Sequence, residues 1–121
     1  MSLWTWLGVA ALGGVGANAR FLLNGLVSRR VGDDLPLGTF AVNASGSLLL
    51  GLLSGLALNG DALVLAGSAT LGSYTTFSTW MLETHRLAGR GRTRAALLNV
   101  LVSLAVGLVA VTLGRTIGAH L

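Results

Sequence analysis

The chain has 121 residues, of which 53% are hydrophobic and only 10% are charged, with a net charge of +4 and no cysteine. Because an average soluble domain contains about 25% charged residues, this composition excludes a solvated globular enzyme, a disordered chain, a disulfide framework and a cysteine-based metal site. Its basic residues are eight arginines in an otherwise apolar chain. This pattern argues against a nucleic-acid-binding face and predicts a small integral membrane protein of one domain.

Four apolar segments are long enough to cross a bilayer as helices, which takes about 20 residues each. They predict a single four-helix transmembrane domain over residues 1–121, with helices at residues 3–27, 35–58, 62–82 and 95–114. No segment alternates apolar and polar residues, so we do not expect a β-barrel. No basic residue precedes the first apolar run, which argues against a cleaved signal peptide.

The connections between these segments are short and polar. Pro36 suits the first turn of the second helix, and Asp61 suits the N-cap of the third. The opposite side of the membrane carries only Arg115, whereas the first and third connections carry six arginines: Arg29, Arg30, Arg86, Arg90, Arg92 and Arg94. The positive-inside rule therefore predicts that these two connections are cytoplasmic and that both termini lie outside.

Glycine spacing in the first segment has two readings. The run from Gly14 to Ala19 fits G-x-G-x-x-A, and Asp34 follows Gly14 by twenty residues, as in a dinucleotide fingerprint. That fingerprint needs a strand, a helix and a second strand, whereas this run lies in a membrane segment. We therefore expect close helix packing, which two further pairs with the same spacing also predict: Gly51 with Gly55, and Gly114 with Gly118.

Two polar residues of the first two segments are candidates for a function. Arg20 lies well inside the first apolar segment, where a charge either faces a cavity that attracts anions or extends toward the membrane surface. Asn43 lies eight residues into the second segment, with Ser45 and Ser47 after it. Its amide either pairs with a neighbouring helix or lines a pore as a donor.

The third segment has the densest polar pattern. The run from Gly72 to Trp80 contains six hydroxyl-bearing residues, and such residues bend helices by bonding to backbone carbonyls. We predict that the helix breaks over residues 72–79 and lines a water-filled path. The alternative is a kinked helix held by hydroxyl bonds.

Polar residues elsewhere are fewer. Asn99 and Ser103 lie one turn apart in the fourth segment, where they either extend a polar track or pair with another helix. Glu83, His85 and Arg86 form a cluster that suits local pairing and lipid headgroups. No predicted span contains Asp, Glu or His, which argues against proton-coupled or cation-coupled transport, a hydrolytic triad and a carboxylate metal cage.

Together these motifs resemble those of the CrcB/Fluc family of small fluoride channels over nearly the whole chain. The matching motifs are Gly13-x-x-Gly16-Ala17-x-x-Arg20, then Gly38-Thr39-x-x-x-Asn43-x-x-Gly46-Ser47, and Gly72-x-x-Thr75-Thr76-Phe77-Ser78-Thr79. The resemblance implies an antiparallel, dual-topology dimer with two fluoride pathways along its interface. It also implies a structural sodium ion, held by the backbone carbonyls of Gly72 and Thr75 from both subunits.

The same resemblance suggests which residues meet fluoride. Arg20 would lie in an anion-attracting vestibule, and the expected pathway consists of Asn43, Thr76, Phe77, Ser78, Thr79, Trp80, Asn99 and Ser103. Trp80 stands where the family usually has a second Phe, and Asn99 stands where it often has Tyr. The six-to-one arginine distribution also departs from a balanced dual-topology chain. A homodimer is our main expectation, with an oppositely oriented paralogue as the alternative partner.

The resulting hypothesis is a passive channel, not an enzyme, that exports fluoride across the bacterial inner membrane and relieves its toxicity. One alternative is a small four-helix drug or cation exporter, which would need a buried carboxylate. The other is a membrane scaffold without transport, which would explain the glycines but not the hydroxyl run around Phe77.

Overall fold

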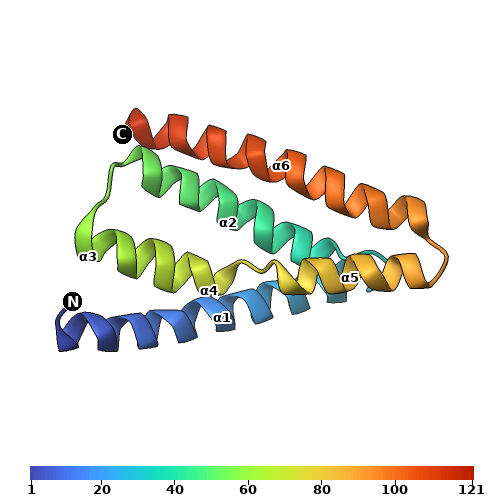
Figure 1. Cartoon of the computed structure of the whole chain (residues 1–121), viewed down its shortest axis with the longest axis horizontal. Coiled ribbons are helices and arrows are strands. Elements are labelled where there is room, and N and C mark those ends of the chain that lie inside the picture. Colours follow the sequence, from blue (N-terminus) through green and yellow to red (C-terminus); the bar gives the residue numbers. More distant parts are fainter.

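Four rods of helix lie side by side, and the third rod is interrupted (Figure 1). The computed structural model describes all of residues 1–121 and contains no strand. Three rods are continuous helices: α1 (Leu3–Val31), α2 (Leu37–Gly55) and α6 (Thr93–Ala119). The third consists of four pieces in sequence: α3 (Gly60–Leu63), the π-helix η1 (Val64–Leu71), α4 (Gly72–Tyr74) and α5 (Ser78–Gly89). The predicted all-helical architecture is confirmed.

The helices continue beyond several predicted ends. α1, α2 and α6 are each long and apolar enough to cross a membrane, but α1 reaches Val31 and α6 reaches Ala119. α5 includes Glu83–Gly89, which the sequence pattern had placed in a connection. Hydropathy marks where a helix leaves the hydrocarbon, whereas the helix ends where the backbone turns. Here Gly32 and Gly91 follow α1 and α5 with φ of 81° and 77°, a conformation that favours glycine.

Asp61 does not cap the third rod, contrary to our prediction. The N-cap of α3 is Asn59, in an extended conformation, and Asp61 lies in the first turn. Its carboxylate instead accepts a 3.0 Å hydrogen bond from the hydroxyl of Thr5, a buried residue of α1. This contact ties the start of the third rod to the start of α1.

The chain runs up and down, so both termini lie at the same end of the bundle (Figure 1). The opposite end holds the α1–α2 and α5–α6 connections and the six arginines that the sequence assigned to them, and we call it the arginine-rich end. An ion pair of 3.0 Å between Arg92 and Asp34 joins its two connections. The six arginines that the sequence assigned to the two connections therefore lie at one end of the folded bundle.

Glycines bring α2 and α6 into backbone contact along parallel axes. A Cβ atom at Gly51 would overlap the carbonyl of Val111, and one at Gly114 would overlap the carbonyl of Leu48. Gly55 and Gly118 make equivalent contacts one turn further along. The predicted packing role of both glycine pairs is confirmed. In α1, Gly16 packs against Thr70 and Ser73, whereas Gly14 has open space around it.

The interior is small, as expected for helices that face lipid. Only 14 of 121 residues are buried, and half of these are glycines. Val42 is the only large side chain that is fully buried, while many leucines and valines of α1 and α6 are exposed. Backbone proximity between helices, rather than a core of large side chains, therefore holds this bundle together.

The contact between α2 and α6 can be tested with a single methyl group. We expect Gly114→Ala to lower the thermal unfolding midpoint in detergent, because its Cβ meets the Leu48 carbonyl. Gly14→Ala is the matched control, since it adds the same methyl in open space of a helix and gains up to about 1 kcal/mol in helix propensity. Equal midpoints for the two variants would contradict the proposed packing.

Candidate functional site

The third rod is broken over three residues, Thr75–Phe77, between α4 and α5. Thr75 leaves the helix with ψ of 162°, and both its N–H and its hydroxyl donate to the carbonyl of Leu71 at 3.0 Å. The predicted break is confirmed but is narrower than residues 72–79. Gly72 stays in α4, and Ser78 and Thr79 begin α5, because local hydroxyl bonds end the helix only at Thr75.

A π-helix precedes the break, and the sequence pattern did not predict it. Within η1, the N–H of Gly72 donates to Gly67, five residues earlier. The hydroxyl of Thr70 also reaches back five residues, to the carbonyl of Leu65 at 2.7 Å. π-Helical segments are rare and often lie at functional sites. No periodicity in Val64–Leu71 distinguishes it from an ordinary apolar helix, so hydropathy could not reveal it.

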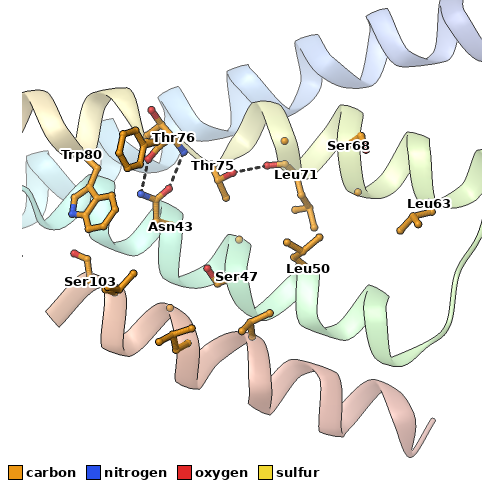
Figure 2. A pocket seen from close by; sticks show the side chains of 18 residues that line it. Asn43, Ser47, Leu50, Leu63, Ser68, Leu71, Thr75, Thr76, Trp80 and Ser103 are labelled. Atoms are coloured by element: carbon orange, nitrogen blue, oxygen red, sulfur yellow. Dashed lines mark hydrogen bonds between the residues drawn. The ribbon is translucent and has the colours of Figure 1, made fainter. Parts of the chain in front are cut away.

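Asn43 of α2 holds the middle of the break with two hydrogen bonds (Figure 2). Its Nδ2 donates to the Thr76 carbonyl at 2.8 Å, and its Oδ1 accepts from the Thr76 N–H at 2.9 Å. The hydroxyl of Thr76 in turn accepts a 3.2 Å hydrogen bond from the N–H of Thr79, and this bond caps the start of α5. The interhelical pairing considered for Asn43 is therefore present, and the same residue lines a groove.

Several backbone groups at and beside the break have no hydrogen-bond partner in the chain, although the Phe77 carbonyl accepts from the Met81 N–H at 3.0 Å. The carbonyls of Gly72 and Thr75 accept no hydrogen bond, and the N–H groups of Phe77 and Ser78 donate none. One half-helix therefore presents free acceptors and the next presents free donors. Interrupted helices with this arrangement can bind cations at one side and anions at the other.

A groove of about 740 Å³ runs past the break between α2, the third rod and α6 (Figure 2). We call it the central groove. Seven of the predicted ion-site residues line it: Asn43, Gly72, Thr75, Thr76, Phe77, Trp80 and Ser103. Phe77 is 69% exposed, so its ring stands at an open side of the groove. Ser47 and Ser68, which were not predicted to contact an ion, also line the groove.

The other predicted residues do not line the central groove. Thr79 lines a separate polar cavity of about 410 Å³ at the arginine-rich end, together with Glu83 and Arg86. Asn99 and Ser103 line a third cavity near Arg94, so Ser103 borders two cavities. Ser78 lines none of these three cavities. The other expected pathway residues are divided among the three, because residue spacing along a helix does not specify which side of the helix faces which cavity.

Trp80 and Asn99, the two departures from the family pattern, are hydrogen-bonded to each other. The indole N–H of Trp80 donates to the main-chain carbonyl of Asn99 at 3.2 Å. The Asn99 amide donates to the Thr84 hydroxyl at 2.9 Å, and this hydroxyl donates to the Trp80 carbonyl at 2.8 Å. These bonds connect α5 to α6. The Trp80 ring also meets Phe77 edge to face, with centroids 5.7 Å apart and an angle of 84°.

Arg20 lies near the break by its position along α1. It is half-buried and makes no ion pair, and it lines none of the three cavities. Gly16, one turn before it, packs against Ser73, and α1 runs parallel to the third rod. This register brings the guanidinium-bearing turn of α1 alongside the Thr75–Phe77 interruption.

Glu83 makes a contact that the sequence reading missed. Its carboxylate accepts a hydrogen bond from the hydroxyl of Thr39, a buried residue near the start of α2. Thr39 belongs to the second-helix motif, which was the only sequence signal for it. A second missed contact joins Tyr74 to Ser45, with their hydroxyl oxygens 2.7 Å apart. Both contacts tie α2 to the third rod on either side of the break.

The sequence matches a family model over residues 7–115, the model of the CrcB-like protein, Camphor Resistance (CrcB). The chain belongs to this family. A relative in Mycolicibacterium paratuberculosis, named fluoride-specific ion channel FluC 2, is 54% identical over 91% of this chain and 90% of its own length. One in Symbiobacterium thermophilum, named fluoride-specific ion channel FluC 1, is 46% identical over 95% and 96%.

A relative in Haloarcula marismortui, named fluoride-specific ion channel FluC 2, is 44% identical over 87% of this chain and 86% of its own length. With three membrane-length helices in the structure, this chain is a multi-pass membrane protein, and the bacterial inner membrane fits it.

The clamp on Thr76 makes a direct prediction. Asn43→Leu keeps the side-chain volume but leaves both part-buried backbone groups of Thr76 without a partner in the chain, which costs less than the roughly 1–3 kcal/mol of a fully buried group. We expect a lower unfolding midpoint and faster hydrogen exchange at the Thr76 amide. Asn18→Leu is the control, because Asn18 is exposed and bonds only within α1, to Gly14. Unchanged exchange at Thr76 in Asn43→Leu would contradict the clamp.

Proposed function

We propose that this chain forms a passive, fluoride-selective channel that lets fluoride leave the cell. The observation that carries the proposal is the interrupted third rod, in which the N–H groups of Phe77 and Ser78 are free and Phe77 lines an open groove. The names of the relatives support fluoride as the permeating ion. They also favour a channel over the two alternatives, a small drug or cation exporter and a membrane scaffold.

Fluoride is small and tightly hydrated, so a pathway must replace the donors that water provides. The central groove offers hydroxyls at Thr76 and Ser103 and the second N–H of the Asn43 amide, which has two donors and uses one for Thr76. Phe77 adds a ring edge, which carries partial positive charge. Trp80 contributes its ring rather than its N–H, because that N–H already donates to Asn99. Ser78, Thr79 and Asn99 would extend the route beyond the groove.

A structural sodium ion is also part of the proposal. The free carbonyls of Gly72 and Thr75 are hard oxygen ligands of the kind that hard cations prefer, so these residues fit the ion. A sodium ion bound there would supply positive charge beside the anion pathway. Two carbonyls from one chain are too few to replace a hydration shell, which supports a site shared by two copies.

We propose that a second copy covers the open side of the groove in antiparallel orientation. The exposed ring of Phe77 and the open groove leave the pathway incomplete in one chain. The arginine distribution opposes insertion in both orientations, and the folded chain keeps all six arginines at one end. A homodimer remains our preferred assembly, and a paralogue inserted in the opposite orientation is the alternative.

The electrical driving force makes a coupling ion unnecessary. Hydrogen fluoride crosses membranes as a neutral weak acid and ionises inside, and a negative interior then drives the anion outward with about 2.3 kcal/mol per 100 mV. The central groove has no carboxylate among its lining residues. Glu83 instead lines the polar cavity with Arg86 and Arg90. The central groove therefore resembles a conduit more than the binding site of a proton-coupled exporter.

Flux measurements test this proposal. Liposomes that contain the purified chain should release fluoride but retain chloride. We expect Phe77→Ile to reduce fluoride flux about ten-fold or more, because an aliphatic side chain lacks the positive ring edge. Phe21→Ile is the control, since Phe21 is 76% exposed on α1 and lines none of the three cavities. Absence of fluoride release from the unmodified protein would reject the channel.

Cysteine labelling tests the assembly, since the chain has no native cysteine. Single cysteines at Asn59→Cys and Arg90→Cys would mark the two ends of the bundle. In a dual-topology homodimer, an impermeant thiol reagent added outside intact cells should label about half of each variant. Complete labelling of Asn59→Cys with none of Arg90→Cys would exclude the homodimer and favour a paralogous partner.

A further inference from the structure

A third cavity opens at the arginine-rich end, between the start of α2 and the start of α6. Its volume of about 630 Å³ falls within the range of about 300–1,000 Å³ that is usual for ligand cavities. We call it the Arg94 cavity. It shares Ser103 with the central groove but is otherwise lined by different residues, and the fluoride proposal does not account for most of its surface.

The lining of the Arg94 cavity is divided into two chemical parts. One wall is apolar and is formed by residues from the start of α2 and the first turns of α6: Leu35, Pro36, Leu37, Phe40, Leu98 and Val102. The rim is formed by the α5–α6 turn, including Arg92 and Arg94. Leu37, Leu98 and Val102 are 40%, 51% and 44% exposed, so no side chain of this chain covers the apolar wall.

The charge at the rim has one sign. No Asp or Glu lines the Arg94 cavity. Arg92 is paired with Asp34 at 3.0 Å, but Arg94 is exposed and makes no ion pair. An anion at the rim would therefore meet one free guanidinium and one partly neutralised guanidinium, with no opposing carboxylate on the cavity wall. Arginine suits phosphate oxygens especially well, because its planar donors can bind two of them at once.

The two parts lie at the depths that a phospholipid would require. α6 begins at Thr93 and has a mean hydropathy of 2.4 over its most apolar stretch, so the arginine rim lies where this helix leaves the hydrocarbon. Val102 is eight residues beyond Arg94, about 12 Å deeper along the helix axis. A phosphate at the rim would thus place its acyl chain against the apolar wall.

We infer that the Arg94 cavity binds an anionic glycerophospholipid, with its phosphate at Arg94 and one acyl chain along Leu98 and Val102. The positive rim selects an anionic headgroup, and the uncovered apolar wall requires a hydrocarbon chain. Anionic leaflets attract arginines near the membrane surface, and in the proposed antiparallel dimer one of the two arginine-rich ends lies at the cytoplasmic leaflet. This inference depends on the membrane location of the chain. Asn99 and Ser103, which belong to the proposed fluoride route, also line the cavity, so the acyl chain would lie beside that route.

Native mass spectrometry of the full chain in a non-ionic detergent tests the inference. We expect the protein to retain phosphatidylglycerol in preference to phosphatidylcholine. Arg94→Gln should weaken the retention of phosphatidylglycerol about five-fold, as expected for one arginine near an anionic surface. Arg30→Gln is the matched control, because Arg30 is an exposed arginine at the same end that lines none of the three cavities.

A second pair of variants tests the acyl chain. Leu98→Trp should fill the apolar wall and reduce retention, whereas Leu97→Trp, at an exposed neighbour outside the cavity, should not. Unfolding midpoints show whether each variant is folded, and if Leu98→Trp is not, Arg94→Gln decides alone. Equal retention by the Arg94 and Arg30 variants would overturn the inference. So would equal retention of phosphatidylcholine, or displacement of the lipid by glycerophosphoglycerol at the same concentration, which would indicate a free phosphate site.

Discussion

Lipid offers no hydrogen-bond partner to the backbone, so a helix that is interrupted inside a membrane must satisfy its exposed groups within the protein. Asn43 does this for Thr76 by bonding to both its N–H and its carbonyl. The neighbouring carbonyls of Gly72 and Thr75 and the N–H groups of Phe77 and Ser78 stay free, and Gly72, Thr75 and Phe77 line the central groove. The proposed ion binding depends on this division. Asn43 bonds to the backbone of Thr76, whereas the backbone groups of the neighbouring residues have no partner and are free to bind ions.

Close helix packing around the break stabilises the pairing of Asn43 with Thr76. Gly51 and Gly114 let α2 and α6 meet at the level of their backbones, and Gly46 admits the side chain of Thr75 against α2. Because a close helix contact fixes rotation as well as distance, Asn43 is held at the height of Thr76. The glycines therefore support the site indirectly, by giving α2 a single position relative to the third rod.

The two ends of the bundle differ in their chemistry. The arginine-rich end contains the Arg92–Asp34 ion pair, the Thr39–Glu83 hydrogen bond and both cavities that lie outside the central groove. The opposite end is tied by the contact of Thr5 with Asp61. A dimer of oppositely oriented copies would place one arginine-rich end at each membrane surface. This arrangement would give the proposed pathways positive entrances on both sides, at the cost of inserting one copy against its charge bias.

Much of the architecture follows from local properties of the sequence. Apolar length alone determined that the chain forms membrane-length rods. Glycine spacing determined that α2 and α6 each carry a face suited to close packing, because helix rise and periodicity relate neighbours in sequence directly to neighbours in space. The density of hydroxyls around Phe77 located the break to within a few residues. The family resemblance, rather than a local pattern, grouped Asn43, Thr76, Phe77, Trp80 and Ser103, which all line the central groove.

Tertiary structure alone decided what each polar group does. Asn43 and Thr76 are 33 residues apart, and no local pattern could show that their amides pair or that the indole of Trp80 is already bonded to Asn99. The π-helix of Val64–Leu71, the assignment of Thr79 and Asn99 to separate cavities and the contact of Glu83 with Thr39 were equally unforeseen. The π-helix depends on a local change of backbone hydrogen bonding. The other features depend on how far a helix is rotated about its own axis, and that rotation is set by contacts with the other rods rather than by the sequence of the helix itself.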